Sequence, residues 1–159
     1  MKIHAKILLC AVFMLPAILN AQDKKDEISH KCEHKGKAII QTDNSPKAIG
    51  PYSQGNVSGG FLFTSGQLPI HPVTGKIPSS IEEQTKQVLE NLKAIVEEAG
   101  SSLENVVKCT VYLQDMKDFG VMNKIYASYF KDNPPARVCV EVSKMAKNAL
   151  VEISAIAAL

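Results

Sequence analysis

Hydrophobic positions recur at helical spacing between Ile81 and Ala99, and this is the clearest periodic segment of the chain. Ser80, directly before it, is a suitable N-cap, and Glu83 three residues later completes a capping box. Gly100, directly after it, can adopt the left-handed conformation that often ends a helix. The pattern therefore predicts a helix whose two ends are both defined by their own sequence.

Alternation of apolar and polar residues, which is typical of strands, occurs on both sides of this helix. Gly59 and Gly60 separate two of the alternating segments and predict a hairpin. A second helix is expected to begin near Asp115 or Asp118 and to end before Pro134. The expected strands cover residues 38–41, 52–57, 61–67, 106–113, 137–142 and 150–157.

The predicted order is three strands, a helix, a strand, a helix and two strands. This order favours an α+β fold, in which a mixed sheet has both helices packed on one face. The second face of such a sheet is uncovered, and the chain has no further predicted element to cover it. A partly apolar bare face is normally covered, so we expect partner subunits in a closed ring.

The last two strands carry the candidate chemistry. Val138 and Val140 alternate with Arg137 and Cys139, and Glu152 lies in the following strand. We expect the valines to meet the helices, which would place Arg137 and Glu152 together on the opposite face, in clefts between subunits.

Arg137 is the only arginine of a chain that has 17 lysines. A guanidinium binds a carboxylate through two parallel hydrogen bonds, which an ammonium group cannot reproduce. The position therefore favours recognition of a carboxylate. Two alternatives remain open: a composition that happens to favour lysine, and a purely structural pair between Arg137 and Glu152 across adjacent strands.

The N-terminus has the features of a secretory signal: two lysines, an apolar run too short to span a bilayer, and a small residue at Ala21. We expect a signal peptide at 1–21, a charged flexible linker at 22–37 and one domain at 38–159, with the protein exported to the periplasm or secreted. An uncleaved anchor is the alternative. Cleavage would lower the formal net charge from +2 to 0, which argues against binding to nucleic acid or to an anionic membrane.

Cysteine and histidine usage gives little support for disulfides or metal. Cys32, Cys109 and Cys139 would remain after cleavage, and an odd number cannot form a complete disulfide framework. His30, Cys32 and His34 could bind a metal ion, but three ligands on a flexible segment are a weak signal. We expect no structural or catalytic metal.

Five separated motifs resemble the RidA/YjgF family, and together they span roughly residues 38–159. They are AIGPYSQG (48–55), TSGQLP (64–69), QTKQVLENLKAIVEEAG (84–100), PPARVCVEV (134–142) and VEISAIA (151–157). The resemblance implies a chorismate-mutase-like fold that assembles as a homotrimeric barrel with active sites between subunits. It also implies hydrolysis of 2-iminobutanoate and 2-iminopropanoate to 2-oxo acids and ammonia, without a cofactor.

The resemblance further implies roles for particular residues. Arg137 would bind the substrate carboxylate, and Glu152 would activate water and transfer protons. Asn91 and Phe119 are weaker candidates for the cleft wall, and a hydrogen-bonded core asparagine is the preferred explanation of Asn91. The implied substrate-binding residues are Tyr52, Ser65, Gly66, Asn91, Phe119, Arg137 and Cys139.

Three alternative functions remain. The same cleft could bind a small carboxylate without turnover, or the assembly could act as a stress-induced holdase. A nuclease or translation inhibitor is a third alternative, which the near-neutral charge and the lack of a basic aromatic patch disfavour.

Overall fold

The computed structural model describes residues 36–159. The predicted signal peptide, the His30–His34 cluster and nearly all of the predicted linker therefore lie outside the described residues. Within residues 36–159, no helix is both long enough and apolar enough to cross a membrane.

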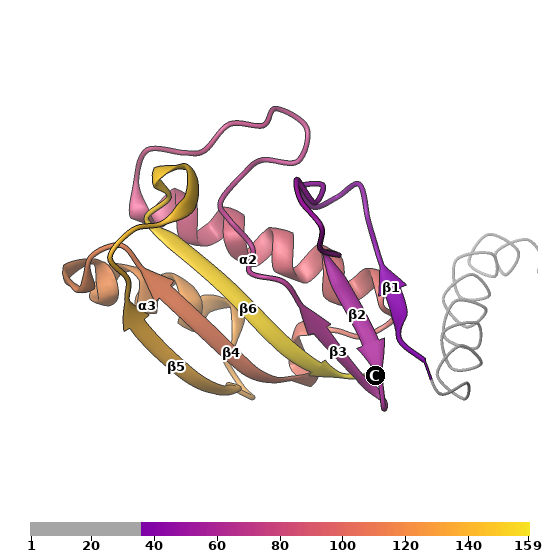
Figure 1. Ribbon diagram of the computed structural model, residues 1–159. Helices are drawn as coiled ribbons and strands as arrows, with labels where there is room; N and C mark the ends of the chain where they lie inside the picture. The colour runs from indigo at the N-terminus through magenta and orange to yellow at the C-terminus, as the bar shows by residue number, and fades with distance from the viewer. Residues whose placement is uncertain (1–35) are drawn as a thin grey trace, which may run out of the picture.

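Six strands form one sheet. They are β1 (Ala38–Ile40), β2 (Gly55–Ser58), β3 (Phe61–Thr64), β4 (Val106–Leu113), β5 (Ala136–Glu141) and β6 (Val151–Ala158). Their order across the sheet is β1-β2-β3-β6-β4-β5 (Figure 1). β4 and β5 run parallel, whereas the other neighbouring pairs are antiparallel. The chain therefore returns through the middle of the sheet, where its last strand lies between β3 and β4.

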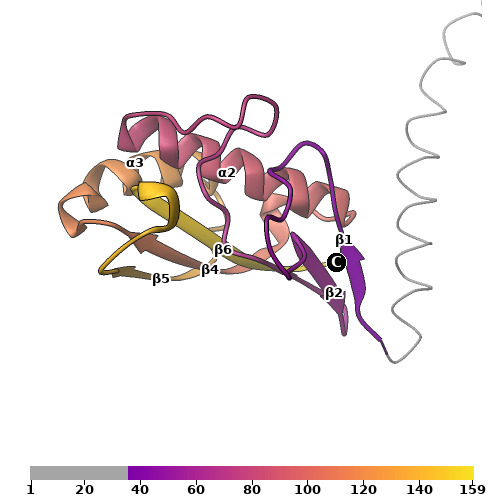
Figure 2. The same cartoon turned by 45° about the horizontal axis from the view of Figure 1, so that its top comes forward.

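Both helices, α2 (Ile81–Glu98) and α3 (Phe119–Tyr129), pack on the same face of this sheet (Figure 2). No described helix covers the other face, which we call the open face. The predicted α+β architecture, with a mixed sheet and both helices on one side, is confirmed.

The ends of α2 are capped as predicted. Ser80 Oγ accepts a hydrogen bond from the Glu83 backbone N–H at 3.2 Å and donates to Glu83 Oε2 at 3.1 Å. Gly100 has a φ of +80°, and its N–H donates to the Glu97 carbonyl at 3.0 Å. These contacts satisfy backbone groups that a helix end would otherwise leave unpaired.

The core lies between the sheet and the two helices. Leu92 and Ile95 of α2, Met122 of α3, Val111 of β4 and Ile153 of β6 are fully buried there. Burial of one such side chain stabilises the fold by roughly 1.5–3 kcal/mol. This packing fixes which face of each strand is available to the open side.

The hairpin between β2 and β3 turns at Gly59 and Gly60, as predicted. Their φ values are +59° and +79°, and the favoured two-residue hairpin turn requires positive φ at both positions. Both strands are shorter than the sequence predicted, because 52–54 and 65–67 form loops, in which Gln67 makes an isolated bridge to Ile153 of β6. Those loops carry three of the candidate site residues.

A register shift near the start of β4 changes the predicted faces of two residues. The shift lies between Val106 and Lys108, so Val106 is buried and Val107 is 45% exposed. Strict alternation along 106–113 predicts that Val107 shares the buried face of Cys109 and Val111, whereas a bulge of this kind inserts one residue and exchanges the two faces. From Cys109 onward the predicted alternation is confirmed.

Candidate active site

Arg137 lies in the edge strand β5, and its side chain is on the helix face. It stands opposite Cys109 of β4, which belongs to the core. Its Nη2 donates a hydrogen bond to Asn123 Oδ1 at 2.7 Å. Its guanidinium carbon is 4.5 Å from the centre of the Tyr126 ring and 5.7 Å from that of Phe119. We call Arg137, Asn123, Tyr126 and Phe119 the arginine group.

The prediction that the valines of β5 would face the helices is therefore wrong. Val138 and Val140 lie on the open face and are 43% and 39% exposed. Because β5 is an edge strand, its helix side lies beside α3 at the border of the core and not at the centre of the core. A long cation can pack its stem there and keep its charged end accessible.

Glu152 lies in the central strand β6, and its side chain is on the open face. It stands opposite Tyr112 of β4, one residue away from the core residues Val151 and Ile153. Its carboxylate packs directly against Gly66, where a Cβ atom would overlap with Glu152 Oε1. Partial burial raises the pKa of Glu152 above its usual range. The site therefore holds a half-buried carboxylate with an increased proton affinity.

Two loops hold the backbone next to this carboxylate. Gln67 exchanges backbone hydrogen bonds with Ile153 of β6 at 2.8 and 3.2 Å, which fixes the preceding Ser65 and Gly66 beside Glu152. Ser65 Oγ donates to the Ser53 carbonyl at 2.6 Å. We call Glu152, Gly66 and Ser65 the glutamate group.

Tyr52 lies on the loop that borders the glutamate group. Its side chain is 50% exposed, and its hydroxyl accepts a weak hydrogen bond from the Ile49 N–H at 3.3 Å. Within one chain, this contact turns the hydroxyl toward its own loop. The ring is free to contact a ligand or a second chain.

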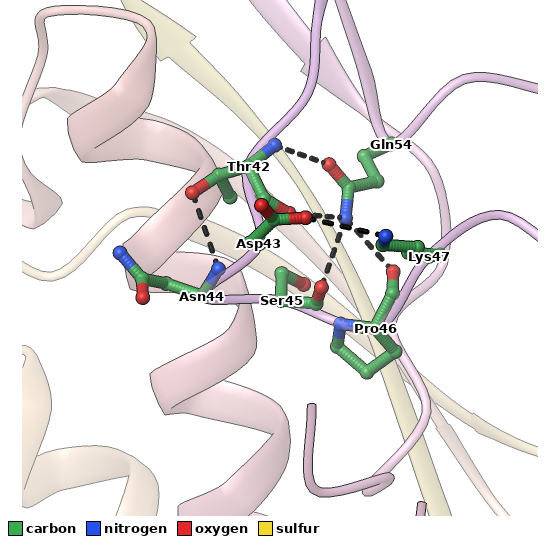
Figure 3. Close-up of polar contacts among 7 residues, drawn as sticks. All are labelled: Thr42, Asp43, Asn44, Ser45, Pro46, Lys47 and Gln54. Carbon is green, nitrogen blue, oxygen red and sulfur yellow. Dashed lines mark hydrogen bonds and ion pairs between the residues drawn. The ribbon is translucent and has the colours of Figure 1, made fainter. Parts of the chain in front are cut away.

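A buried glutamine anchors the loop that leads to Tyr52. Gln54 Oε1 accepts from the Thr42 N–H at 2.7 Å, and its Nε2 donates to the carbonyls of Thr42, Ser45 and Pro46 at 3.0, 3.1 and 2.8 Å (Figure 3). Ser45 Oγ continues the network to Gln67 Oε1 at 3.1 Å. The side chain of Gln67 in turn donates to the Ser65 carbonyl at 3.1 Å. The network therefore runs from the loop at residues 42–46 to the glutamate group.

The arginine and glutamate groups lie on opposite faces of the sheet. In addition, β4 lies between β5 and β6, so Arg137 and Glu152 are not on adjacent strands. The prediction that Arg137 and Glu152 lie together on the open face is therefore wrong, and the structural pair considered above is excluded as well. One copy of the chain therefore presents the arginine group and the glutamate group separately.

Comparison with known proteins decides the family. The profile described as Endoribonuclease L-PSP matches residues 42–159. The chain belongs to this family, which includes the RidA proteins. A RutC family protein of Pyrococcus horikoshii is 58% identical over 76% of this chain and 97% of its own length. The 2-iminobutanoate/2-iminopropanoate deaminase of Escherichia coli K12 is 46% identical over 74% and 94%.

Solved structures agree with this membership. The crystal structure of E. coli TdcF with bound serine has a TM-score of 0.75 and 43% identity, and covers 77% of this chain and 98% of its own. The structure of the YjgF gene product of E. coli has a TM-score of 0.74 and 44% identity over 76% and 98%. The sheet and helices described above are thus the fold of the RidA family.

The structure also places Asn91, Cys139 and Phe119. Asn91 is fully buried, and its amide donates to the carbonyls of Leu68 and Ile70 at 2.9 Å each. These contacts agree with the structural alternative, a hydrogen-bonded core asparagine. Cys139 is half-buried on the helix face, and burial raises the pKa of its thiol. Phe119, by contrast, is exposed beside Arg137.

Sequence reasoning missed four residues around the arginine and glutamate groups. Asn123 and Tyr126 contact Arg137, and Gln54 and Gln67 anchor the loops. In the sequence, Tyr126 shares helical spacing with Phe119 and Met122 and is therefore expected on an apolar stripe, and Asn123 beside that stripe gives no signal of its own. The two glutamines lie inside family motifs, but their partners are backbone carbonyls far along the chain. Within residues 36–159, no three His, Cys, Asp or Glu side chains are grouped as a metal site.

Proposed function

We propose that this RidA-family protein hydrolyses small 2-imino acids, and the enamines in equilibrium with them, to 2-oxo acids and ammonia. The reaction takes place between subunits of a homotrimer and uses no metal or cofactor. The observation that carries the proposal is the separation of Arg137 and Glu152 on opposite faces of one sheet. Two half-sites of complementary chemistry on opposite faces become one site when a second copy supplies the missing half.

The open face supports assembly. Its exposed apolar side chains extend from β1 through β3 to β5, and water would contact them in a single copy. A closed ring of identical subunits would bury this face and bring the edge strand of one copy beside the next. These residues include Ile39 at 62%, Phe63 at 44%, Val138 at 43%, Phe61 at 41% and Val140 at 39%.

The arginine group supplies recognition of the substrate carboxylate. One N–H of Arg137 is bound to Asn123, which leaves other N–H groups of the guanidinium to form a bidentate pair with a carboxylate. A substrate held in this way presents its neighbouring imine carbon in a fixed direction. Such positioning can supply several kcal/mol of the reduction in the barrier, on the order of 7 kcal/mol for well-aligned groups.

The glutamate group supplies the proton transfers. Glu152 accepts a proton from water as the water oxygen bonds to the carbon of the protonated imine, whose nitrogen becomes a neutral amine. The same carboxyl group gives this proton to the amine nitrogen. The C–N bond then breaks with its electron pair on nitrogen, and the hydroxyl proton passes to the Glu152 carboxylate as the C=O bond forms. The products are a 2-oxo acid and ammonia, so one water is consumed and no electrons are exchanged. The raised pKa of Glu152 favours this return of the proton.

The assay generates 2-iminobutanoate freshly and follows release of 2-oxobutanoate in the presence of the protein. We expect a rate above buffer for the wild-type chain and losses for Arg137→Ala and Glu152→Gln. An intact assembly that binds 2-oxobutanoate without any rate above buffer would support the non-catalytic binding alternative instead.

Cleavage of RNA is a second candidate, since the family profile carries the name endoribonuclease. The surroundings of the half-sites disfavour it, because Arg137 is the only cation of the arginine group. RNA cleavage by a preparation free of contaminating ribonuclease, persisting in both Arg137→Ala and Glu152→Gln, would require a different site and would revive this candidate.

We also propose that the chain is exported after cleavage near Ala21, on the strength of its N-terminal sequence. N-terminal sequencing of the protein recovered from separated cell compartments tests this. Recovery of the chain with Met1 from the cytoplasm would contradict it.

A further inference from the structure

Arg137 is part of a stack of three side chains at the rim of α3. Its guanidinium carbon lies 4.5 Å from the centre of the Tyr126 ring. That ring in turn packs against Phe130, with 4.6 Å between ring centres and a 35° tilt. Tyr126 and Phe130 are 5% and 6% exposed, so the ring beneath the cation has little freedom to move. The guanidinium therefore rests on a fixed aromatic surface.

The hydroxyl of Tyr126 makes no contact that would account for a tyrosine at this position. It is buried and has no hydrogen-bond partner among the described residues. It lies near the Cys109 thiol without the geometry of a hydrogen bond. Burial first, and this thiol second, raise the pKa of Tyr126 far above its usual value, so the phenol stays neutral. Tyr126 is therefore unsuited to proton transfer, and what it offers Arg137 is the face of its ring.

The ring face of Tyr126 restrains a tilt of the guanidinium plane that the hydrogen bond to Asn123 does not restrain. A single hydrogen bond from Nη2 to Asn123 fixes one corner of the guanidinium but allows its plane to tilt about that bond. A bidentate pair with a carboxylate requires the plane to be set, because both N–H groups must point along parallel lines. An aromatic face under the cation attracts it and restricts this tilt.

We propose that Tyr126 is a positioning residue for Arg137, whose ring sets the plane in which the guanidinium binds a carboxylate. The link to a substrate carboxylate depends on the function proposed above, whereas the restraint on Arg137 does not. Loss of the ring leaves the charge of Arg137 and its bond to Asn123 in place, so we expect it mainly to weaken carboxylate binding and to raise KM.

The experiment uses the fact that the chain has one arginine. In uniformly 15N-labelled full-length protein, the Arg137 Nε–Hε pair gives a single side-chain arginine signal. Tyr126→Phe keeps the ring and removes the hydroxyl, whereas Tyr126→Met fills similar space without a ring. Tyr129→Leu, on the same helix, is the matched control because its hydroxyl bonds to Glu90 and it does not contact Arg137.

We expect wild type, Tyr126→Phe and Tyr129→Leu to share a ring-current-shifted, slowly relaxing Arg137 signal and a similar KM. Tyr126→Met should lose that shift, show faster side-chain motion, and raise KM about tenfold with kcat changed less than threefold. An unchanged signal and KM in Tyr126→Met would overturn the proposal. Equal losses in Tyr126→Phe would also overturn it, since the hydroxyl would then be responsible.

The two readouts separate this proposal from the proposed function. If the wild-type protein shows no deaminase activity but Tyr126→Met still releases the Arg137 signal, the restraint stands and the deaminase proposal fails. If Tyr126→Met does not fold, Phe130→Leu removes the support beneath the ring and must weaken the same signal. Retention of the wild-type signal in a folded Phe130→Leu protein would count against the stack.

Discussion

The arginine group and the glutamate group are held in place by different means. Side chains of one short helix restrain Arg137 through a hydrogen bond and a ring face. Glu152 is instead enclosed by backbone, because Gly66 lies against its carboxylate and a pair of backbone hydrogen bonds fixes the adjacent loop. The position of Arg137 therefore depends on a few side chains and less on the backbone around it. The arrangement around Glu152 tolerates no added atom at Gly66.

This difference fits the chemistry that we assign to each half. A carboxylate-binding cation needs a defined plane, which side-chain stacking can provide. A carboxylate that transfers protons needs partial desolvation, which close backbone packing provides and which raises the pKa of Glu152. The predictions below perturb one half at a time.

The largest effect is expected at Arg137. Arg137→Lys keeps the positive charge but loses the planar fork, so we expect kcat/KM to fall by roughly 10²–10³-fold while the protein stays folded. Steady-state kinetics and the thermal unfolding midpoint measure the two effects separately. Lysine at this position with near wild-type kcat/KM would refute the bidentate binding mode.

Gly66→Ala should damage the glutamate group through geometry alone. The added methyl group must displace the Glu152 carboxylate, and a displacement of about 1 Å can reduce the rate by roughly 100-fold. The matched control is Gly120→Ala, since a Cβ atom there meets no neighbouring atom. Equal activity of both alanine variants would show that the contact with Gly66 is irrelevant.

A substitution at Gln54 tests the hydrogen-bond network that anchors the loops on either side of Tyr52 and Ser65. Replacement by Leu leaves the Thr42 N–H and three carbonyls without their partner, which should reduce the free energy of unfolding by roughly 1–3 kcal/mol. Activity should fall only severalfold, because the network acts at a distance from the reacting atoms. Denaturant unfolding measures the first effect, and an unchanged midpoint would contradict it.

The pH dependence of Glu152 should give the smallest effect. Because burial raises its pKa, the acid limb of kcat/KM should lie at higher pH than for an exposed glutamate. The native state also keeps this proton to higher pH than the unfolded chain does. The free energy of unfolding should therefore decrease as pH rises from the unfolded pKa to the raised native pKa, and Glu152→Gln should remove that contribution. Identical pH slopes in both proteins would contradict the pKa shift.

Local signals in the sequence were sufficient for most of the fold. The caps of α2 and the glycine hairpin depend on neighbouring residues only, and both were predicted correctly. The face of β5 was predicted wrongly, because alternating valines are typical of strand positions that face a core. Val138 and Val140 face the open side, where assembly rather than the chain's own helices would bury them. A single sequence does not distinguish these two kinds of burial.

The site was predictable in its residue types but not in its arrangement. Arg137 and Glu152 stood out by composition and by motif, yet the separation of their strands by β4 depends on β6 inserting between β3 and β4. Strand order of this kind is set by contacts distant in sequence. For the same reason, the carbonyl partners of Gln54 and the ring beneath Arg137 could be found only in three dimensions.

Mixing of subunits tests the central claim most directly. Arg137→Ala and Glu152→Gln chains are unfolded together in equal amounts, refolded and assayed beside each variant refolded alone. If each site takes Arg137 from one copy and Glu152 from another, about a quarter of the sites in random assemblies regain both groups. We therefore predict recovery of about a quarter of wild-type activity. A mixture no more active than the two variants alone would contradict a site shared between chains.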